Sequence, residues 1–164
     1  MLGKRHPNRI SVTKNFRQHI ANMAGSRVLP ADARVRVLGI SAANMNDDVA
    51  PWTSTSEAAL EFALDYAKNK HNTDTIMLDL RQLNFRHCEG YYSKNAKACI
   101  FLCSISEMDE KDQMIEIYDR AIVWTDVVIV ATLIRWESTS SLYYQMAQRM
   151  NCVQNQIVTH NTTI

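Results

Sequence analysis

The chain has 164 residues and a mass of 18.8 kDa, which suffices for one ordinary domain and is too short for two. Apolar residues make up 46% of the chain and charged residues 21%, values that exclude a disordered or fibrous protein. No apolar run approaches the roughly 20 residues that cross a bilayer, and the N-terminus lacks the apolar core of a secretion signal. We therefore expect a soluble, cytoplasmic protein without a membrane span, in which the four cysteines stay reduced.

The net charge of +1 is unevenly distributed along the chain. Residues 1–34 carry seven lysines and arginines against one aspartate, whereas the remainder is mildly acidic. This basic arm has no dense arginine cluster, so we expect no nucleic-acid partner. A short helix is predicted in the arm, because apolar residues recur at helical spacing before Gly25: Val12, Phe16, Ile20 and Met23. Such a helix suits packing against a sister subunit, and an organelle-targeting role stays open.

Residues 35–164 alternate between predicted strands and predicted helices. The predicted strands cover 35–41, 73–80 and 126–131. The predicted helices cover 58–70, 109–125 and 140–150, and a long irregular segment over 84–108 holds three of the four cysteines. This alternation predicts right-handed crossovers and a parallel sheet.

The pattern within these elements predicts which side chains are packed. In the first helix, the packed face is predicted from three- and four-residue spacing: Ala59, Phe62, Ala63 and Tyr66. Ser54 and Glu57 have the spacing of a capping box at its start. The second helix has a predicted apolar side made of Met114, Ile117, Tyr118, Ala121 and Ile122. The strand 126–131 is continuously apolar after Asp126, which is typical of a strand covered on both faces.

The ends of the first and third strands are the predicted binding region. In open parallel sheets, ligands bind beyond the carboxyl ends of the strands, at the point where the strand order reverses. The first strand leads into hydroxyl residues 53–56 at a helix N-terminus, where free amides and the helix dipole favour a phosphate. The third strand leads into the polar and aromatic loop 132–138, which suits a planar ring.

Four segments resemble the NAD(P)H-dependent FMN reductases of the flavodoxin-like superfamily. They are LGIS at 38–41, TSEAALEFALDYA at 55–67, LDLRQLNFRHCEGYYSKNAKACIFLCSISEMDEKDQMIEIYDR at 78–120 and TLIRWESTSSLYYQMAQRMNCVQNQI at 132–157. The resemblance implies a flavodoxin-like three-layer α/β/α domain over 35–164, with a parallel sheet of strand order 2-1-3. The family continues into a fourth and a fifth strand, so we expect a fold truncated after the third strand and its helix.

The resemblance also implies FMN as the cofactor, with NADPH or NADH as hydride donor and a quinone, a flavin or another small molecule as electron acceptor. No acid or base is implied. By position, four residues would surround the FMN phosphate: Ser41, Thr53, Ser54 and Ser56. Six would cradle the isoalloxazine, mainly through backbone groups: Thr132, Leu133, Ile134, Arg135, Trp136 and Ser138. Arg135 would also place a charge near the ring or near the nicotinamide cosubstrate.

The chain departs from the family pattern at several positions. Leu133 stands where relatives commonly have proline, and Glu137 where they commonly have glycine. The phosphate loop has no lysine or arginine and instead contains Asp47 and Asp48. The third strand would form an open edge, which predicts cover by the arm or by another chain, and hence a homo-oligomer. The alternative function is therefore a noncatalytic module for oligomerisation or binding.

The cysteine-containing segment raises the separate hypothesis of a metal or iron–sulfur site. His87, Cys88, Cys99 and Cys103 carry suitable ligand atoms. However, the segment has no compact CxxC pair, and Tyr91 stands where iron–sulfur flavoproteins place a cysteine. We therefore expect packed free thiols and no metal.

Overall fold

The structure is a computed structural model that describes residues 33–44, 54–95 and 98–160. The predicted N-terminal helix, Thr53 and the Asp47–Asp48 pair lie outside these residues. The strands are β1 (Arg36–Ala42), β2 (Asp74–Asp79) and β3 (Val127–Thr132). The helices are α2 (Thr55–His71), η1 (Leu80–Gln82), α3 (Tyr91–Lys94), α4 (Ser104–Met108), α5 (Met114–Tyr118), the π-helical η3 (Asp119–Trp124), α6 (Ser141–Arg149) and α7 (Asn151–His160).

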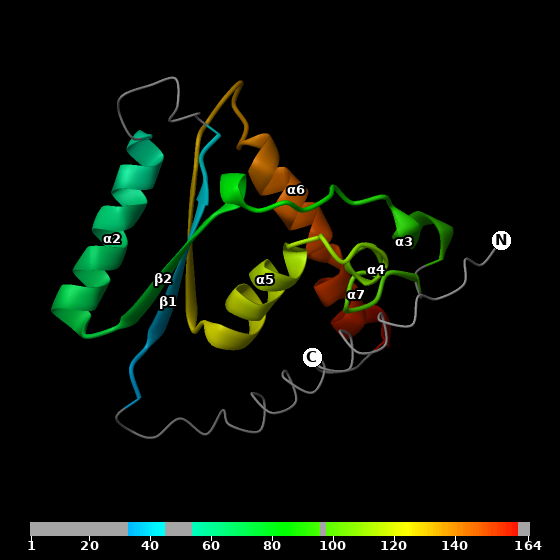
Figure 1. Cartoon of the computed structure of the whole chain (residues 1–164), viewed down its shortest axis with the longest axis horizontal. Coiled ribbons are helices and arrows are strands. Elements are labelled where there is room, and N and C mark those ends of the chain that lie inside the picture. The colour runs from blue at the N-terminus through cyan, green and yellow to red at the C-terminus, as the bar shows by residue number, and fades with distance from the viewer. Residues whose placement is uncertain (1–32, 45–53, 96–97, 161–164) are drawn as a thin grey trace.

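The three strands form one parallel sheet in the order β2-β1-β3, as predicted. Helix α2 lies on one side of the sheet, and α5, α6 and α7 lie on the other (Figure 1). The predicted three-layer arrangement and strand order 2-1-3 are therefore confirmed. A bidentate ion pair joins β1 to the start of β3: Arg36 Nη2 lies 3.0 Å from Asp126 Oδ1, and Arg36 Nε lies 3.1 Å from Asp126 Oδ2.

A small core joins α2 to the sheet. Leu60 and Leu64 are buried against Val37, and Gly39 lets the helix approach closely, since a Cβ there would lie 2.6 Å from Leu64 Cδ1. The predicted packed face of this helix is wrong: Phe62 is 73% exposed and Tyr66 is 52% exposed. Apolar residues occur around most of this helix, and the residues one turn apart that fit the space over Gly39 are the two leucines.

A larger core fills the other side of the sheet. Leu38 and Ile40 of β1 pack with Met114, Ile117 and Tyr118 of α5, all of which are buried. Ala121 and Ile122 pack against the same core, so the predicted apolar side of this segment is confirmed. The helix begins later than predicted, at Met114, because the preceding residues bend through a turn in which the Asp112 amide donates to the Asp109 carbonyl. Within the described ranges, no helix has the length and apolar character needed to cross a membrane.

Strand β3 forms one edge of the described sheet. Val127, Val128 and Val130 are 45%, 43% and 38% exposed, so the prediction of a strand covered on both faces is wrong. Only part of β3 is packed: Ile129 and Ala131 contact the α2 core. Val128 and Val130 share the face of Leu38 and Ile40, but the large core there is centred on β1 and β2.

Candidate functional site

The carboxyl ends of β1 and β3 lie side by side, since Ala42 pairs with Thr132 in the sheet. Ser140 fixes the segment that follows β3. Its Oγ donates to the Ala42 carbonyl at 2.6 Å, and its amide donates to Thr132 Oγ1 at 3.1 Å. Ser140 also caps α6 by accepting from the Tyr143 amide at 3.2 Å. We did not predict this role from the sequence, although the hydroxyl run 138–141 before a helix was a usable signal.

The predicted phosphate side lies at the start of α2. Ser54 is the N-cap residue, as predicted, but its side chain makes no capping hydrogen bond. Its Oγ instead lies 3.0 Å from Ser56 Oγ. The serine half of the predicted capping box is therefore wrong. As a result, the Ser54 hydroxyl does not satisfy the amides of the first helical turn.

Ser41 is the second feature of this side. It is fully buried, and its Oγ has no hydrogen-bond partner in the described part of the chain. Ser41 shares the face of Gly39, which contacts Leu60 and Leu64. Because α2 runs antiparallel to β1, Ser41 lies toward the first turn of the helix. An unpaired buried hydroxyl costs about 1–3 kcal/mol, so a ligand oxygen here would recover free energy.

Charged residues from the end of β2 also lie at this side, and sequence reasoning missed them. Arg81 Nη2 lies 2.9 Å from Asp79 Oδ2 and 3.5 Å from Glu57 Oε2. Asp79 pairs with Ser41 across the sheet. One cation therefore faces two carboxylates, and this charge balance opposes a phosphate. The usable signal was the position of Asp79 and Arg81 at the carboxyl end of a strand that neighbours the first one.

The predicted ring side is a tight hairpin. The amides and carbonyls of Arg135 and Ser138 bond each other at 2.8 and 2.9 Å. Trp136 and Glu137 form the turn with φ of 52° and 59°, the left-handed region that favours glycine. The Trp136 side chain is 99% exposed, and Ile134 is 81% exposed. An indole held outward on a strained turn offers a stacking surface for a planar ring.

The structure places nine of the ten predicted site residues at one end of the sheet, and Thr53 lies outside the described residues. The hydroxyls of Ser41, Ser54 and Ser56 fit a phosphate in donor type, whereas Glu57 and Asp79 oppose it in charge. On the ring side, the backbone groups of Arg135 and Ser138 are used by the hairpin itself, which leaves the turn and the indole for a ligand. Thr132 and Leu133 are half-buried.

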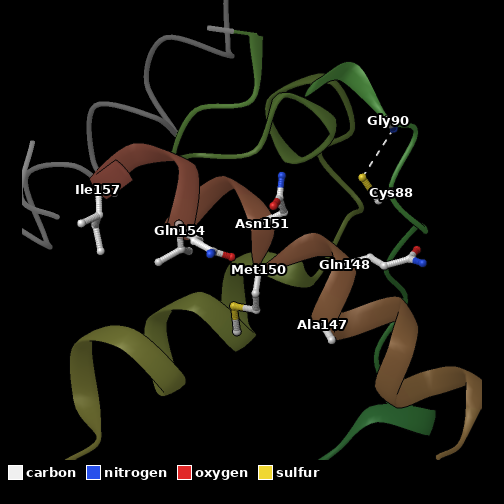
Figure 2. A pocket seen from close by; sticks show the side chains of 9 residues that line it. Cys88, Gly90, Ala147, Gln148, Met150, Asn151, Gln154 and Ile157 are labelled. Atoms are coloured by element: carbon white, nitrogen blue, oxygen red, sulfur yellow. Dashed lines mark hydrogen bonds between the residues drawn. The ribbon is translucent and has the colours of Figure 1, made fainter. Parts of the chain in front are cut away.

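A cavity of about 830 Å³ lies elsewhere, where α6 meets α7 (Figure 2). Cys88, Met150 and Asn151 are among the residues that line it, and none of the lining residues belongs to the predicted site. In the described ranges, no three histidine, cysteine or carboxylate side chains are grouped so that they could hold a metal ion.

Comparison of the chain with protein-family models, curated proteins and solved structures found no match. The geometry of the site is therefore what bears on function.

Proposed function

We propose that this domain binds FMN across the ends of β1 and β3 and acts as an NAD(P)H-dependent flavin oxidoreductase. The observation that supports the proposal best is the position of two unusual features at neighbouring strand ends. These are the buried, unpaired hydroxyl of Ser41 and the fully exposed indole of Trp136. Because the two features lie on either side of the point where the strand order reverses, they suit a ligand with a phosphate at one end and a ring at the other.

In this proposal, Ser41, Ser54 and Ser56 donate hydrogen bonds to the phosphate, together with the first-turn amides of α2. Trp136 stacks on the ring, and Arg135 lies near the nicotinamide. When bound, FMN supplies the hydride-accepting chemistry, and the chain supplies position and polarity. Glu137 places a negative charge beside the ring, which disfavours added electron density there. A quinone or another small acceptor then takes the electrons.

The first test is titration of the purified protein with FMN, followed by absorbance and by quenching of flavin fluorescence. Trp136→Ala should weaken FMN binding by about two- to tenfold, because one aromatic contact contributes about 0.5–1.5 kcal/mol. Phe62→Ala is the matched control: Phe62 is also an exposed aromatic residue, but it lies on α2 facing solvent. Binding of FMN followed by oxidation of NADPH or NADH supports the proposal. A protein that leaves the flavin spectrum unchanged contradicts it.

The exposed edge of β3 favours a second candidate function, that of a noncatalytic module that associates with another copy of itself. Val127, Val128 and Val130 are exposed along a strand whose outer edge is unpaired within the described sheet. Such an edge can pair with a strand of another chain. In sedimentation velocity, this function predicts a dimer that Val128→Lys converts to monomer. Phe62→Lys should leave the dimer intact. A wild-type monomer at all concentrations would rule the candidate out.

A further inference from the structure

A carboxylate lies beside the buried Ser41 hydroxyl, at the strand end where the proposed function places the flavin phosphate. Ser41 and Asp79 are direct neighbours in the register of β1 and β2. Both face α2, because side chains alternate along a strand and Gly39 and Met77, two positions earlier, adjoin the core under that helix. Neighbouring strands are about 4.8 Å apart, so Asp79 brings a negative charge next to the proposed phosphate position.

Glu57 brings a second carboxylate to the same place. It lies in the first turn of α2 and is 7% exposed. Arg81 links the two carboxylates, since its Nη2 lies 3.5 Å from Glu57 Oε2 and 2.9 Å from Asp79 Oδ2. Its position is fixed further by Asp79: Arg81 Nε lies 3.2 Å from Asp79 Oδ2, and the Arg81 amide donates to Asp79 Oδ1 at 3.0 Å. The cation at this end of the sheet is therefore already paired with two carboxylates.

The charge of this group opposes a phosphate monoester. One guanidinium and two carboxylates give a net charge of −1, and the connecting residues 43–53 add two aspartates and no lysine or arginine. A phosphate monoester carries about −1.5 to −2 at pH 7. Because Glu57 is buried, water and salt screen its repulsion only weakly. Its carboxylate also lies in the first turn of α2, where it already interacts with the helix dipole that would favour an anion.

We propose that Glu57 and Asp79 are specificity-determining residues, which make this site bind the unphosphorylated flavin, riboflavin, more tightly than FMN. The inference rests on the proposed flavin site and names the flavin that this site binds best. Riboflavin ends in a neutral hydroxyl, which both donates and accepts hydrogen bonds. It can pair with the Ser41 hydroxyl, which is buried and unpaired within the described ranges, and it can donate to a carboxylate, whereas a phosphate dianion cannot. FMN binds through the same ring contacts but more weakly.

The test titrates the full-length protein with riboflavin and with FMN at the same pH and ionic strength, and follows the quenching of flavin fluorescence. We expect the dissociation constant for riboflavin to be lower than that for FMN by a factor on the order of three to ten, because the repulsion acts on the phosphate alone. Tighter binding of FMN than of riboflavin would overturn the inference and leave the proposed flavin site intact. Failure of both flavins to bind would instead overturn the proposed function, and the inference with it.

The salt dependence of binding is a second measurement on the wild-type protein, so it does not depend on whether a variant folds. Sodium chloride screens repulsion between the carboxylates and the phosphate. The affinity for FMN should therefore rise relative to that for riboflavin between about 0.05 M and 0.5 M salt. A phosphate held mainly by cations would give the opposite sign, with FMN affinity falling as salt is added, and that result would contradict the inference.

Glu57→Gln separates the charge of this side chain from its shape. Glutamine keeps the size and one acceptor oxygen, so riboflavin affinity should change by less than about twofold, while FMN affinity should rise by a factor on the order of three to ten. Glu61→Gln is the matched control, because it removes the same charge from the same helix one turn later, at an exposed position, and it should change neither affinity. An equal effect of Glu57→Gln on both flavins would show that Glu57 acts through the shape of the site, and would overturn its assigned role in specificity.

Discussion

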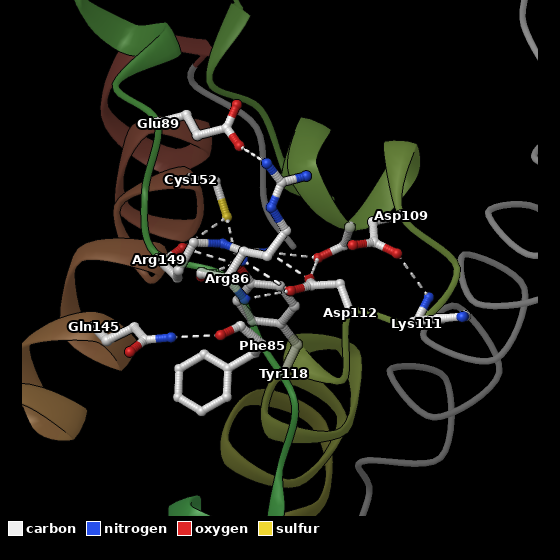
Figure 3. Close-up of polar contacts among 11 residues, drawn as sticks. Phe85, Arg86, Glu89, Asp109, Lys111, Asp112, Tyr118, Gln145, Arg149 and Cys152 are labelled. Atoms are coloured by element: carbon white, nitrogen blue, oxygen red, sulfur yellow. Dashed lines mark hydrogen bonds and ion pairs between the residues drawn. The ribbon is translucent and has the colours of Figure 1, made fainter.

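The interior around Arg149 buries a charged side chain, whereas the hairpin at the end of β3 exposes an aromatic one. Arg149 is 1% exposed, and its guanidinium donates to Asp112, to Ser106 and to the Arg86 carbonyl (Figure 3). At the hairpin, Trp136 is 99% exposed and the backbone of the turn is left-handed. The first region links the irregular segment to α6 and stabilises the fold. We expect the second region to contribute little to stability, and in the proposed function it contacts the ligand, so substitutions should separate stability from binding.

Loss of the buried carboxylate should have the largest effect. Asp112→Asn removes the partner of a cation that stays buried, and breaking such a pair costs about 3–5 kcal/mol. Urea unfolding followed by circular dichroism measures the change. Asp65→Asn, on the exposed side of α2, is the matched control and should change the unfolding free energy by less than about 0.5 kcal/mol. A loss below about 1 kcal/mol for Asp112→Asn would mean that the pair behaves like a surface ion pair.

Acid should weaken the same region. Burial alone would raise the pKa of Asp112, but hydrogen bonds from Arg149, Ser106 and the Arg86 amide lower it below its ordinary value of 3.8. As the pH falls, the unfolded chain therefore takes up this proton before the folded one. The stabilisation is complete above about pH 4 and is lost as the pH falls through the lower folded-state pKa. The difference in unfolding free energy between wild type and Asp112→Asn should therefore become smaller as the pH falls through this range. A difference that stays constant would contradict the lowered pKa of Asp112.

Glu137→Gly should stabilise the protein. Glu137 has a φ of 59°, and the left-handed conformation costs a residue with a Cβ about 1 kcal/mol more than glycine. The unfolding free energy should therefore rise by roughly that amount, less the added flexibility of the unfolded chain. Removal of the carboxylate should also strengthen FMN binding if the proposed site is correct. Glu61→Gly, within α2, should instead be destabilising, as glycine is in any helix interior.

Trp136→Ala should have the smallest effect on stability. The indole is almost fully exposed, so its removal should change the unfolding free energy by less than about 0.5 kcal/mol. The same variant is expected to lose FMN affinity, which makes it the clearest separation of the two regions. A destabilised Trp136→Ala protein would show that the hairpin, like the interior around Arg149, stabilises the fold.

The sequence predicts the strands better than it predicts the helical faces. Strands β1, β2 and β3 stand out because each contains a short apolar run between polar segments, and β3 is almost entirely β-branched. The packed face of α2 does not stand out in the sequence, because alanines and aromatic residues occur on several sides of the helix. Leu60 and Leu64 form the packed face because they fit over Gly39. Burial of β3 was also mispredicted, because an apolar run shows that a strand is apolar but not how many helices cover it.

At the candidate site, the sequence predicts the residue types but not their pairing. The hydroxyl run before α2 and the aromatic loop after β3 are visible as local patterns. The approach of Arg81 to Glu57 and the burial of Arg149 against Asp112 depend on residues 24 and 37 positions apart. No local pattern carries such information. The left-handed turn at Trp136 was equally hidden, because neither turn residue is glycine.

The ion pair between Arg36 and Asp126 has a consequence for the order in which the chain folds. Strand β1 begins to pair with β2 across 38 residues, whereas Arg36 and Asp126 are 90 positions apart. Closing the longer loop costs about 0.8 kcal/mol more in chain entropy. The β1–α2–β2 unit should therefore form first, and the other edge of β1 should pair with β3 afterwards. During synthesis on the ribosome, that edge should stay unpaired until Asp126 and β3 have emerged. Arg36 can then form its ion pair with Asp126, at the start of β3.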